Sequence, residues 1–304
     1  MKKKYEKRLR ALNRKKRREE IGRRSLIRIR NVSLGVLFIV LLFLVVLLIR
    51  NLFLDGRSRS RMAELQKYVS ADNRKNGTEE LIPTEEEKPV GKKTEKETEA
   101  VPEVRRREEG RLLQYQLLYQ ENNDLCGWLR IPDTVIDYPV MHRENDNDFY
   151  LAHDFSKEED VNGLLVLDKR CDPNGTDANL LIHGHNMRSG FMFGSLKEYK
   201  DPAYFEAHPT IWYDTLYHEY TYRIAAVFLS SVGEERDKDF DFYDYINIDT
   251  EEEFYAYVNG AREASLYDTR LTPVYGDQLL TLSTCDYSKE DGRLVIVAFR
   301  HPGQ

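Results

Sequence analysis

The chain has 304 residues with 46 Lys or Arg, 52 Asp or Glu and a net charge of −6, and this charge is unevenly divided. Residues 1–31 hold fifteen Lys or Arg and three Asp or Glu, whereas the rest of the chain is acidic. A basic tail can bind nucleic acid, but this one adjoins an apolar segment and carries almost no aromatic side chains. We therefore expect no nucleic-acid partner, because membrane topology and contact with anionic lipid explain the tail more simply.

The apolar segment that follows includes Val32–Ile49, eighteen residues without a charge, and extends through Leu52-Phe53-Leu54. At about 1.5 Å per residue the uncharged run is roughly 27 Å long, close to the ~30 Å hydrocarbon core of a bilayer. It is longer than the apolar region of a usual signal peptide, and no clear small-residue cleavage site follows it. We predict a single transmembrane helix over residues 32–54 in the cell membrane, with residues 1–31 cytoplasmic and the remainder extracellular.

Residues 55–109 are rich in Glu, Lys, Arg, Thr and Pro and nearly free of aromatic side chains. Such a segment buries too little apolar area to offset its chain entropy, so we expect a disordered extracellular stalk. A short helix around residues 61–69 is an alternative that the sequence leaves undecided. Residues 110–304 hold nearly all the aromatic residues, and we expect them to form one catalytic domain with a complete core.

Apolar periodicity and turn residues predict the elements of this domain. A helix is expected at 112–122, a helical turn at 148–151, a short helix at 189–199 and a longer helix at 250–265, where Thr250 and Glu253 form a capping box. Strands are expected at 127–131, 135–141, 163–168, 178–183, 210–213, 218–231, 278–285 and 293–299. Many strands, few helices and no regular alternation between them indicate a mainly β fold, a closed or nearly closed barrel with inserted helices.

The domain has three cysteines, an odd number, so at least one thiol stays unpaired within the chain. A disulfide between Cys126 and Cys171 is an open alternative that sequence alone cannot establish. Cys285 is the candidate for the free thiol, because it ends the apolar run Leu279-Leu280-Thr281-Leu282-Ser283-Thr284.

A proton-transfer group and a cation accompany Cys285. The apolar run Leu180-Leu181-Ile182 leads into His183-Gly184-His185-Asn186-Met187, and Arg293 opens the last strand eight residues after the cysteine. Cysteine, histidine and arginine at the ends of strands form a candidate nucleophilic site. The other histidines show no metal-ligand spacing, so we expect no metal and no cofactor.

The combination of Thr-Leu-Ser-Thr-Cys at 281–285, Gly-His-Asn-Met at 184–187 and Arg293 resembles the sortase transpeptidases, class B in particular. The resemblance covers about residues 110–300. It implies an eight-stranded β-barrel with amino-terminal helices and a long helix between the sixth and seventh strands. It also implies a sorting-motif peptide, Asn-Pro-x-Thr or related, as substrate, with an amine of a peptidoglycan precursor as acceptor.

The resemblance also assigns roles to residues. Cys285 is the expected nucleophile rather than a core cysteine, and His185, directly after glycine, is favoured over His183 as acid and base. Arg293 is expected to donate hydrogen bonds to an oxyanion or to substrate carbonyls, rather than to pair with Asp291 or Glu290 on the surface. Candidates for substrate binding or support of these groups are Ser283, Thr284, Asn186, Asp286 and His183, with Asp286 considered for orienting His185 or Arg293.

Three rival functions fit the same residues. Within the enzyme class, the acceptor amine belongs either to the cell wall or to a lysine of a pilin that is being polymerised. A thiol peptidase, whose acceptor is water, has the same nucleophile. A catalytically idle, membrane-tethered module that binds sorting peptides belongs to another class, and the presence of the complete Cys, His and Arg set counts against it.

Overall fold

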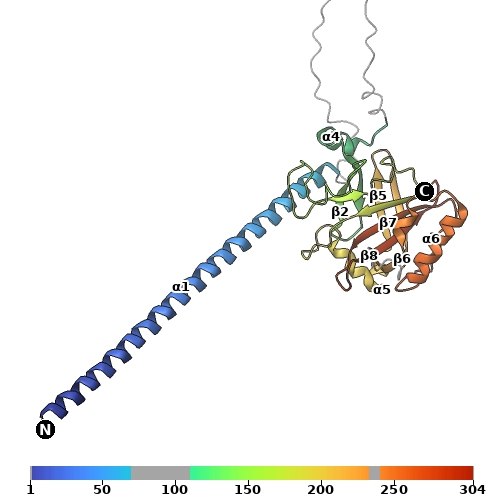
Figure 1. The fold of residues 1–304 in the computed structure, drawn as a ribbon. Helices are drawn as coiled ribbons and strands as arrows, with labels where there is room; N and C mark the ends of the chain where they lie inside the picture. The colour runs from blue at the N-terminus through green and yellow to red at the C-terminus, as the bar shows by residue number, and fades with distance from the viewer. Residues whose placement is uncertain (1, 70–109, 233–239, 304) are drawn as a thin grey trace, which may run out of the picture. The chain divides into compact units, whose positions relative to one another are not determined.

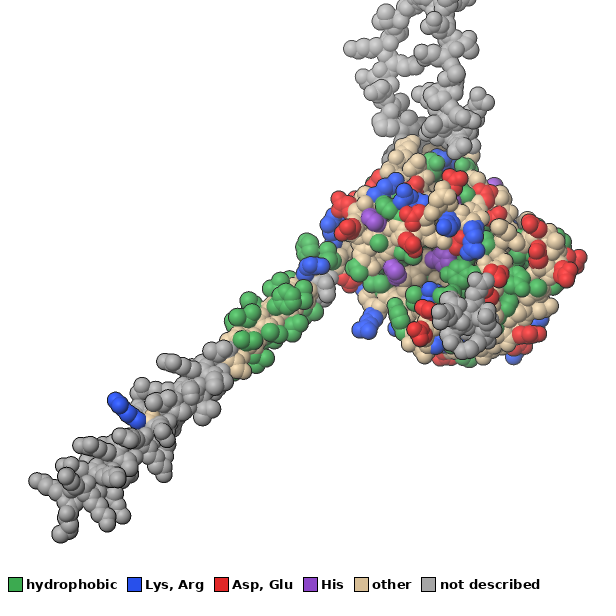
Figure 2. Space-filling view, viewed as in Figure 1, with side chains coloured by type: hydrophobic (Ala, Val, Ile, Leu, Met, Phe, Trp, Pro, Cys, Tyr) green, Lys and Arg blue, Asp and Glu red, His purple; other side chains and the backbone are tan. Residues whose placement is uncertain are grey.

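The computed structural model describes residues 2–69, 110–232 and 240–303 (Figure 1). The chain divides into two compact units, Met1–Arg57 and Ser58–Gln304. The first unit is part of the long helix α1 (Lys2–Val69). Within the described residues, one helical stretch inside Ser33–Val69 is long and apolar enough to cross a membrane. Figure 2 shows hydrophobic side chains along this part of the helix, and those from Leu34 to Ile49 are mostly exposed.

The second unit is built on a barrel. In the described part of the chain, eight strands close in the order β1-β2-β3-β4-β7-β8-β6-β5, with β5 pairing back onto β1, which confirms the expected eight-stranded barrel. The strands are β1 (Leu125–Arg130), β2 (Asp137–Met141), β3 (Leu165–Leu167), β4 (Asn179–His183), β5 (Thr210–Thr215), β6 (Glu219–Ser231), β7 (Gln278–Cys285) and β8 (Gly292–Arg300).

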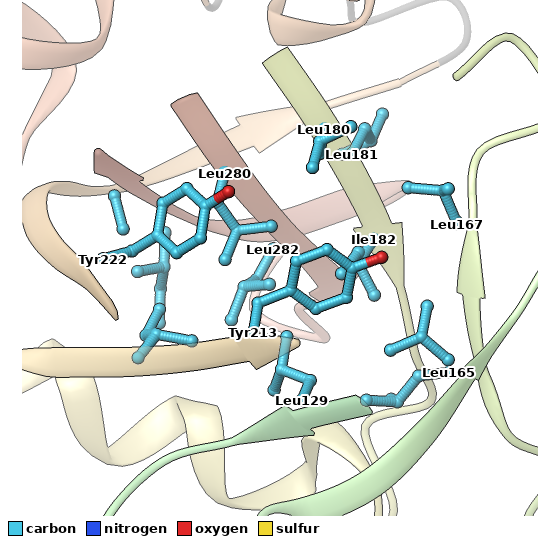
Figure 3. Packing of buried hydrophobic residues seen from close by; sticks show 14 of the residues in the cluster. Leu129, Leu165, Leu167, Leu180, Leu181, Ile182, Tyr213, Tyr222, Leu280 and Leu282 are labelled. Atoms are coloured by element: carbon cyan, nitrogen blue, oxygen red, sulfur yellow. The ribbon is translucent and has the colours of Figure 1, made fainter. Parts of the chain in front are cut away.

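The core lies inside this barrel. Leu129, Ile182, Tyr213 and Leu282 are each 0% exposed, and Figure 3 shows side chains from several strands pointing toward one another. Burial of these large apolar side chains is the main stabilising term, at roughly 25 cal/mol per Å² of apolar surface removed from water. A closed barrel also leaves no unpaired sheet edge, so the strand ends become fixed positions for polar side chains.

Two neighbouring pairs of strands are parallel, β2 with β3 and β4 with β7. The second pair decides the position of the site, because parallel strands bring their carboxyl ends to the same edge of a sheet. The register places His183 of β4 beside Ser283 of β7. The residues that follow each strand therefore leave the barrel side by side.

Helix α6 (Glu251–Ala264) confirms the long helix expected between the sixth and seventh strands. The Thr250 hydroxyl accepts a hydrogen bond from the Glu253 amide, and the Glu253 carboxylate accepts one from the Thr250 amide, so the capping box is formed. The buried face consists of Phe254, Tyr257, Val258 and Ala261. Figure 1 shows α6 against the side of the barrel, where it packs on β6.

The shorter helices agree with the sequence except in their limits. Helix α4 (Leu113–Glu121) lies where it was expected, whereas the helix expected at 189–199 is the 3₁₀ helix η1 (Phe193–Lys200). It starts late because Gly190 and Met192 adopt positive φ angles of 79° and 51°, which interrupt a right-handed helix. Helix α5 (Pro202–Ala207), capped by Asp201, and the 3₁₀ helix η3 (Phe242–Tyr245) were not expected.

The structure corrects the expected stalk at its amino-terminal end. Residues 55–69 are helical as the end of α1, and from Ser58 onward they belong to the same compact unit as the barrel. The short helix left open at 61–69 is therefore part of a longer helix, and Met62, Leu65 and Val69 are buried. Residues 70–109, the rest of the expected stalk, lie outside the described residues.

Candidate active site

Cys285 and Arg293 face each other at one end of the barrel. Cys285 is the last residue of β7, and the antiparallel register of β7 with β8 pairs it with Arg293. The thiol is free and partly exposed. The backbone hydrogen-bond ladder of the two strands thus holds the cysteine and the arginine opposite each other.

The segment that follows β4 is tied to the end of β7 by three hydrogen bonds. The Gly184 amide donates to the Ser283 carbonyl at 3.2 Å, and the Thr284 hydroxyl donates to the Gly184 carbonyl at 2.8 Å. The Asn186 side-chain amide donates to the carbonyl of Cys285 itself at 2.7 Å. These bonds fix the backbone on both sides of His185 against the strand that carries the thiol.

Gly184 is required by close packing. A Cβ atom at this position would lie 2.6 Å from side-chain carbons of both Leu165 and Phe193, far inside van der Waals contact. The absence of a side chain at position 184 therefore allows the backbone that follows β4 to pass between Leu165 and Phe193. Any larger residue would displace the segment that carries His185.

The ring of His185 has one defined partner. Its Nε2 atom lies 2.7 Å from the Leu151 carbonyl oxygen. A carbonyl can only accept, so Nε2 carries a proton, and in the neutral ring Nδ1 is the nitrogen that accepts one. The hydrogen bond thereby assigns the tautomer and the orientation of the imidazole.

Cys285, His185 and Arg293 line one cleft of about 330 Å³. The other residues that line it are Asn147, Asp148, Leu151, Asp168, Lys169, Arg170, His183, Gly184, Tyr243, Ser283 and Thr284. A cleft of this size accommodates a few residues of an extended peptide. The walls combine apolar surface with side chains of both signs of charge, and no group of metal-ligating side chains occurs in the part of the chain that the structure describes.

A family model described as a sortase domain matches residues 129–301, which include Cys285, His185 and Arg293. The chain belongs to the sortase family. Sortase B of Listeria monocytogenes is 37% identical over 183 residues, covering 59% of this chain and 70% of that protein. Sortase B of Staphylococcus aureus is 25% identical, covering 61% and 73%. The crystal structure of sortase B from Bacillus anthracis has a TM-score of 0.61 and 28% identity over 82% of this chain and 98% of that one.

These relatives make the protein a class B-like sortase, and sortases are cysteine transpeptidases. The resemblance noted in the sequence is confirmed, as is the closed barrel.

Arg293 of the sortase lies along the cleft wall. Its Nη1 donates to the carbonyl of Gly292 at 3.0 Å, and among the described residues it makes no ion pair, in contrast to the surface pairing with Asp291 or Glu290 that the sequence left open. Burial raises the pKa of Tyr243, and the neighbouring Arg293 guanidinium opposes part of that rise. The guanidinium therefore lies next to the Tyr243 hydroxyl.

His183, the competing histidine, is already engaged in the sortase. Its Nε2 lies 3.0 Å from Oδ2 of Asp168, and its ring stacks on Tyr243 with centroids 5.8 Å apart. Asp168 is fully buried and also accepts from Arg170 Nε at 2.9 Å and from the Asn147 side chain at 3.1 Å. Burial opposes ionisation of Asp168, but the hydrogen bonds from His183 and Arg170 outweigh it and hold the pKa of Asp168 well below its usual range.

We expect Asp168→Asn to lower the free energy of unfolding by roughly 2–3 kcal/mol at neutral pH, because it leaves His183 and Arg170 without their buried anion. Since the native pKa of Asp168 lies below the unfolded value, its contribution is present above about pH 4 and is lost as the pH falls through the native pKa. Thermal unfolding of both proteins between pH 3 and pH 8 checks this. The difference in unfolding temperature between the wild type and Asp168→Asn should become smaller below about pH 4. A difference that grows there would contradict a stabilising role for the Asp168 carboxylate.

Asp286 has a different position from the one considered. Its carboxylate forms an ion pair with Lys200 of η1 and accepts from the Ser288 hydroxyl and amide. Burial opposes its ionisation, yet these hydrogen bonds lower the pKa of Asp286. The carboxylate of Asp286 thus binds Lys200 and Ser288 rather than His185 or Arg293. It shapes the β7–β8 turn and links that turn to η1.

Of the remaining candidates, Ser283 and Thr284 line the cleft. Thr284 and Ser283 are both 2% exposed, and the Thr284 hydroxyl is used to hold Gly184. The Ser283 hydroxyl is buried near Tyr243, and its interaction with the Tyr243 hydroxyl opposes part of the rise that burial causes in the pKa of Tyr243. Asn186 serves the Cys285 backbone rather than the cleft itself.

The other two cysteines of the sortase are free and buried. Burial raises the pKa of the Cys126 thiol strongly and that of Cys171 to about 12, so neither forms a thiolate at neutral pH. The disulfide left open between them is not formed in the structure. Cys285 is thus the accessible thiol of the chain.

Sequence reasoning missed Tyr243, Asp168, Asn147 and Leu151 as parts of the cleft. Asp168 had a usable signal, since it directly follows a fully apolar strand and polar residues at strand ends collect at barrel rims. Asn147 and Leu151 lie in the turn expected at 148–151 or beside it, but nothing local indicates that a backbone carbonyl there meets a histidine 34 positions later. Tyr243 is one of many tyrosines and carries no local signal.

Proposed function

We propose that this sortase is membrane-anchored, that it cleaves an Asn-Pro-x-Thr-like sorting motif near the carboxyl end of surface proteins, and that it transfers them to an amine of the cell wall. The observation that carries the proposal is the convergence of Cys285, His185 and Arg293 on one cleft from three different strand ends. The motif and the acceptor in this proposal are those that the resemblance of residues 184–187 and 281–285 to class B sortases implies.

In the acylation step, the Cys285 thiolate attacks the carbonyl carbon after the motif threonine, and the carbonyl oxygen becomes an oxyanion. Arg293 donates hydrogen bonds to that oxygen or to adjacent substrate carbonyls. The C–N bond then breaks, and the imidazolium of His185 gives its proton to the departing amine. The products are a thioester on Cys285 and a neutral imidazole.

In the transfer step, an acceptor amine attacks the thioester carbonyl and loses its proton to His185. The C–S bond breaks, Cys285 leaves as thiolate, and a new amide bond forms, so thiolate and imidazolium are restored. Because Nε2 of His185 is held by the Leu151 carbonyl, Nδ1 is the nitrogen that carries protons to and from substrate.

We also propose that residues 32–54 anchor the protein, with the basic residues 1–31 in the cytoplasm and the barrel outside. The support is an apolar helical stretch of sufficient length within α1 and fifteen basic residues before it. Membrane fractionation and protease protection of intact cells check the orientation. A barrel protected from external protease in intact cells would reverse it.

The proposal is tested by incubating the full-length protein with a panel of fluorogenic sorting peptides, with and without oligoglycine, diaminopimelate-type amines or a lysine peptide, and identifying the products by mass. Wall anchoring predicts transfer to the peptidoglycan-type amines. Preferential transfer to lysine would indicate pilin polymerisation, and hydrolysis unaffected by any amine would indicate a thiol peptidase. Binding without cleavage of any peptide would identify an idle binding module.

The role of Arg293 leads to a specific prediction. Arg293→Ala should lower kcat by roughly a hundredfold or more, because losing one oxyanion donor typically costs about 3 to 4 kcal/mol. Arg293→Lys keeps the charge but loses the planar fork, so it should restore little of this loss. Steady-state kinetics on the preferred peptide measure both. If Arg293→Lys performs like the wild type, charge alone is required and hydrogen-bond donation is not Arg293's role.

A further inference from the structure

The carboxyl end of α1 packs into the barrel unit through one face. The buried positions are Ser58, Met62, Leu65 and Val69, all at most 8% exposed. Their spacing of four, three and four residues places them on one side of a helix. We call residues 58–69 the docking segment.

The docking segment contacts the loop between β2 and β3. The Ser58 hydroxyl donates to the Asp160 carboxylate and accepts from the Asn162 side-chain amide at 3.0 Å. Arg61 forms an ion pair with Asp154 that is mostly shielded from solvent. Hydrogen bonds and an ion pair thus fix the 154–162 part of this loop to the helix.

That loop in turn holds the partner of His185. Gly163 has a φ angle of 56°, and a Cβ atom there would lie 2.3 Å from the Leu151 carbonyl oxygen, so the backbone at 163 rests directly on that carbonyl. The Leu164 amide donates to the Tyr150 carbonyl at 2.7 Å and the Asp160 amide to the Ala152 carbonyl at 2.9 Å, on either side of Leu151. The Leu151 oxygen is the acceptor for His185 Nε2.

A second contact reaches the segment that follows His185. The Arg59 guanidinium lies 5.5 Å from the centre of the Phe191 ring, a cation–π distance. Two residues later the Phe193 amide donates to the His185 carbonyl at 3.0 Å. The docking segment therefore supports the side-chain partner of His185 through one loop and its backbone through another.

We propose that the docking segment positions His185 for proton transfer, with Ser58 and Arg61 as positioning residues that act through the 154–164 loop and the Leu151 carbonyl. This inference rests on the proposed catalytic role of His185. The imidazole has a productive orientation only while Leu151 is held in place, and Leu151 is held from the side of the helix. A protein that begins at residue 70 or at residue 110 would contain the entire barrel with Cys285, His185 and Arg293. It would lack the contacts of the docking segment that hold Leu151.

A purely stabilising role is the competing explanation, and it makes a different prediction. If the docking segment only adds buried area, its loss lowers the unfolding temperature but leaves kcat of the folded molecules unchanged. If it positions His185, kcat of the folded molecules falls, and the ring loses its single tautomer. The two explanations separate in measurements made well below the unfolding temperature.

The test uses the full-length protein and the double variant Ser58→Ala/Arg61→Ala. We expect kcat on the preferred sorting peptide to fall by about tenfold with KM changed less than twofold, since a small misplacement of a catalytic group costs up to about a hundredfold. Glu64→Ala, on the exposed side of the same helix, is the matched control and should retain wild-type kcat. In proton–nitrogen spectra of the histidine rings, the Nε2-protonated signal of His185 should be sharp in the wild type and weakened in the double variant.

A second variant reaches the same carbonyl without altering the helix. Gly163→Ala should displace Leu151 and lower kcat at least as much as the double variant, with circular dichroism confirming the fold. Wild-type kcat and an unchanged His185 signal in the folded double variant would overturn the inference. An inactive His185→Ala together with that result would leave the proposed function intact, whereas an active His185→Ala would remove the basis of both.

Discussion

Cys285→Ala should abolish both cleavage and transfer of sorting peptides, a loss of at least about ten-thousandfold in kcat, while the protein stays folded. In the proposed mechanism the Cys285 thiolate forms and releases the thioester, and a methyl group in its place cannot do so. Cys285 is partly exposed at the end of β7, so removing its sulfur leaves no buried cavity of consequence. Mass analysis of the products measures the loss of activity, and circular dichroism checks that the variant is folded.

The matched controls are the other two cysteines. Cys126→Ala and Cys171→Ala remove thiols that are buried and whose pKa values are raised by that burial. Both variants should retain turnover, with a lower unfolding temperature from the lost packing. Equal inactivation by all three substitutions would mean that loss of folding, and not loss of a nucleophile, explains the Cys285 result.

The second large effect separates the two histidines. His185→Ala should lower kcat by between about a hundredfold and ten-thousandfold, the range of general acid–base catalysis, because in the proposed mechanism His185 protonates the leaving amine. His183→Ala should cost much less in rate, because His183 is bound to Asp168 and stacked on Tyr243 rather than held by Leu151. The main effect of His183→Ala should be a lower unfolding temperature.

Kinetics of both variants on the same peptide, with unfolding temperatures measured in parallel, provide the comparison. His183→Gln, which keeps a hydrogen-bond donor for Asp168, should recover most of the stability lost in His183→Ala. The reverse ranking, with His183→Ala nearly inactive and His185→Ala nearly normal, would transfer the proton-transfer role to His183.

Much of the fold was predictable because local signals and tertiary structure agree. The capping box at Thr250 and the apolar spacing of α6 were both present in the sequence, and the last two strands were complete apolar runs. Helix η1 was placed too early because a periodic pattern does not reveal that Met192 takes a positive φ angle. Helix α5 had a capping aspartate and a proline at its first turn, a signal that was available and overlooked.

The docking segment shows a different kind of miss. Averaged over residues 55–109, the composition is that of a disordered chain, and this average concealed the helical spacing of Ser58, Met62, Leu65 and Val69. Whether such a short apolar stripe is buried depends on the surface it meets, here the loop around Phe155 and the segment at Phe191. No local pattern in the stripe specifies that surface.

The candidate site was predictable in its chemistry but not in its support. Cys285, His185 and Arg293 stand at the ends of recognisable strands, so their types and positions indicated a nucleophile, a proton carrier and a cation. Their convergence depends on the parallel pairing of β4 with β7, which connects residues about 100 positions apart. Asp168 meets His183 across the pairing of β3 with β4, and the Leu151 carbonyl meets His185 from the loop before β3, so both contacts become visible only in the folded chain.

We propose that the reaction passes through a thioester on Cys285, and this intermediate can be observed directly. Full-length protein mixed with an Asn-Pro-x-Thr-like peptide in the absence of an amine, then quenched in acid, should gain the mass of the peptide fragment that ends at threonine. Digestion should place this adduct on Cys285, and an added diaminopimelate-type amine should discharge it with formation of the transfer product. An adduct on another residue, or cleavage that proceeds with no covalent adduct at any time, would contradict the account.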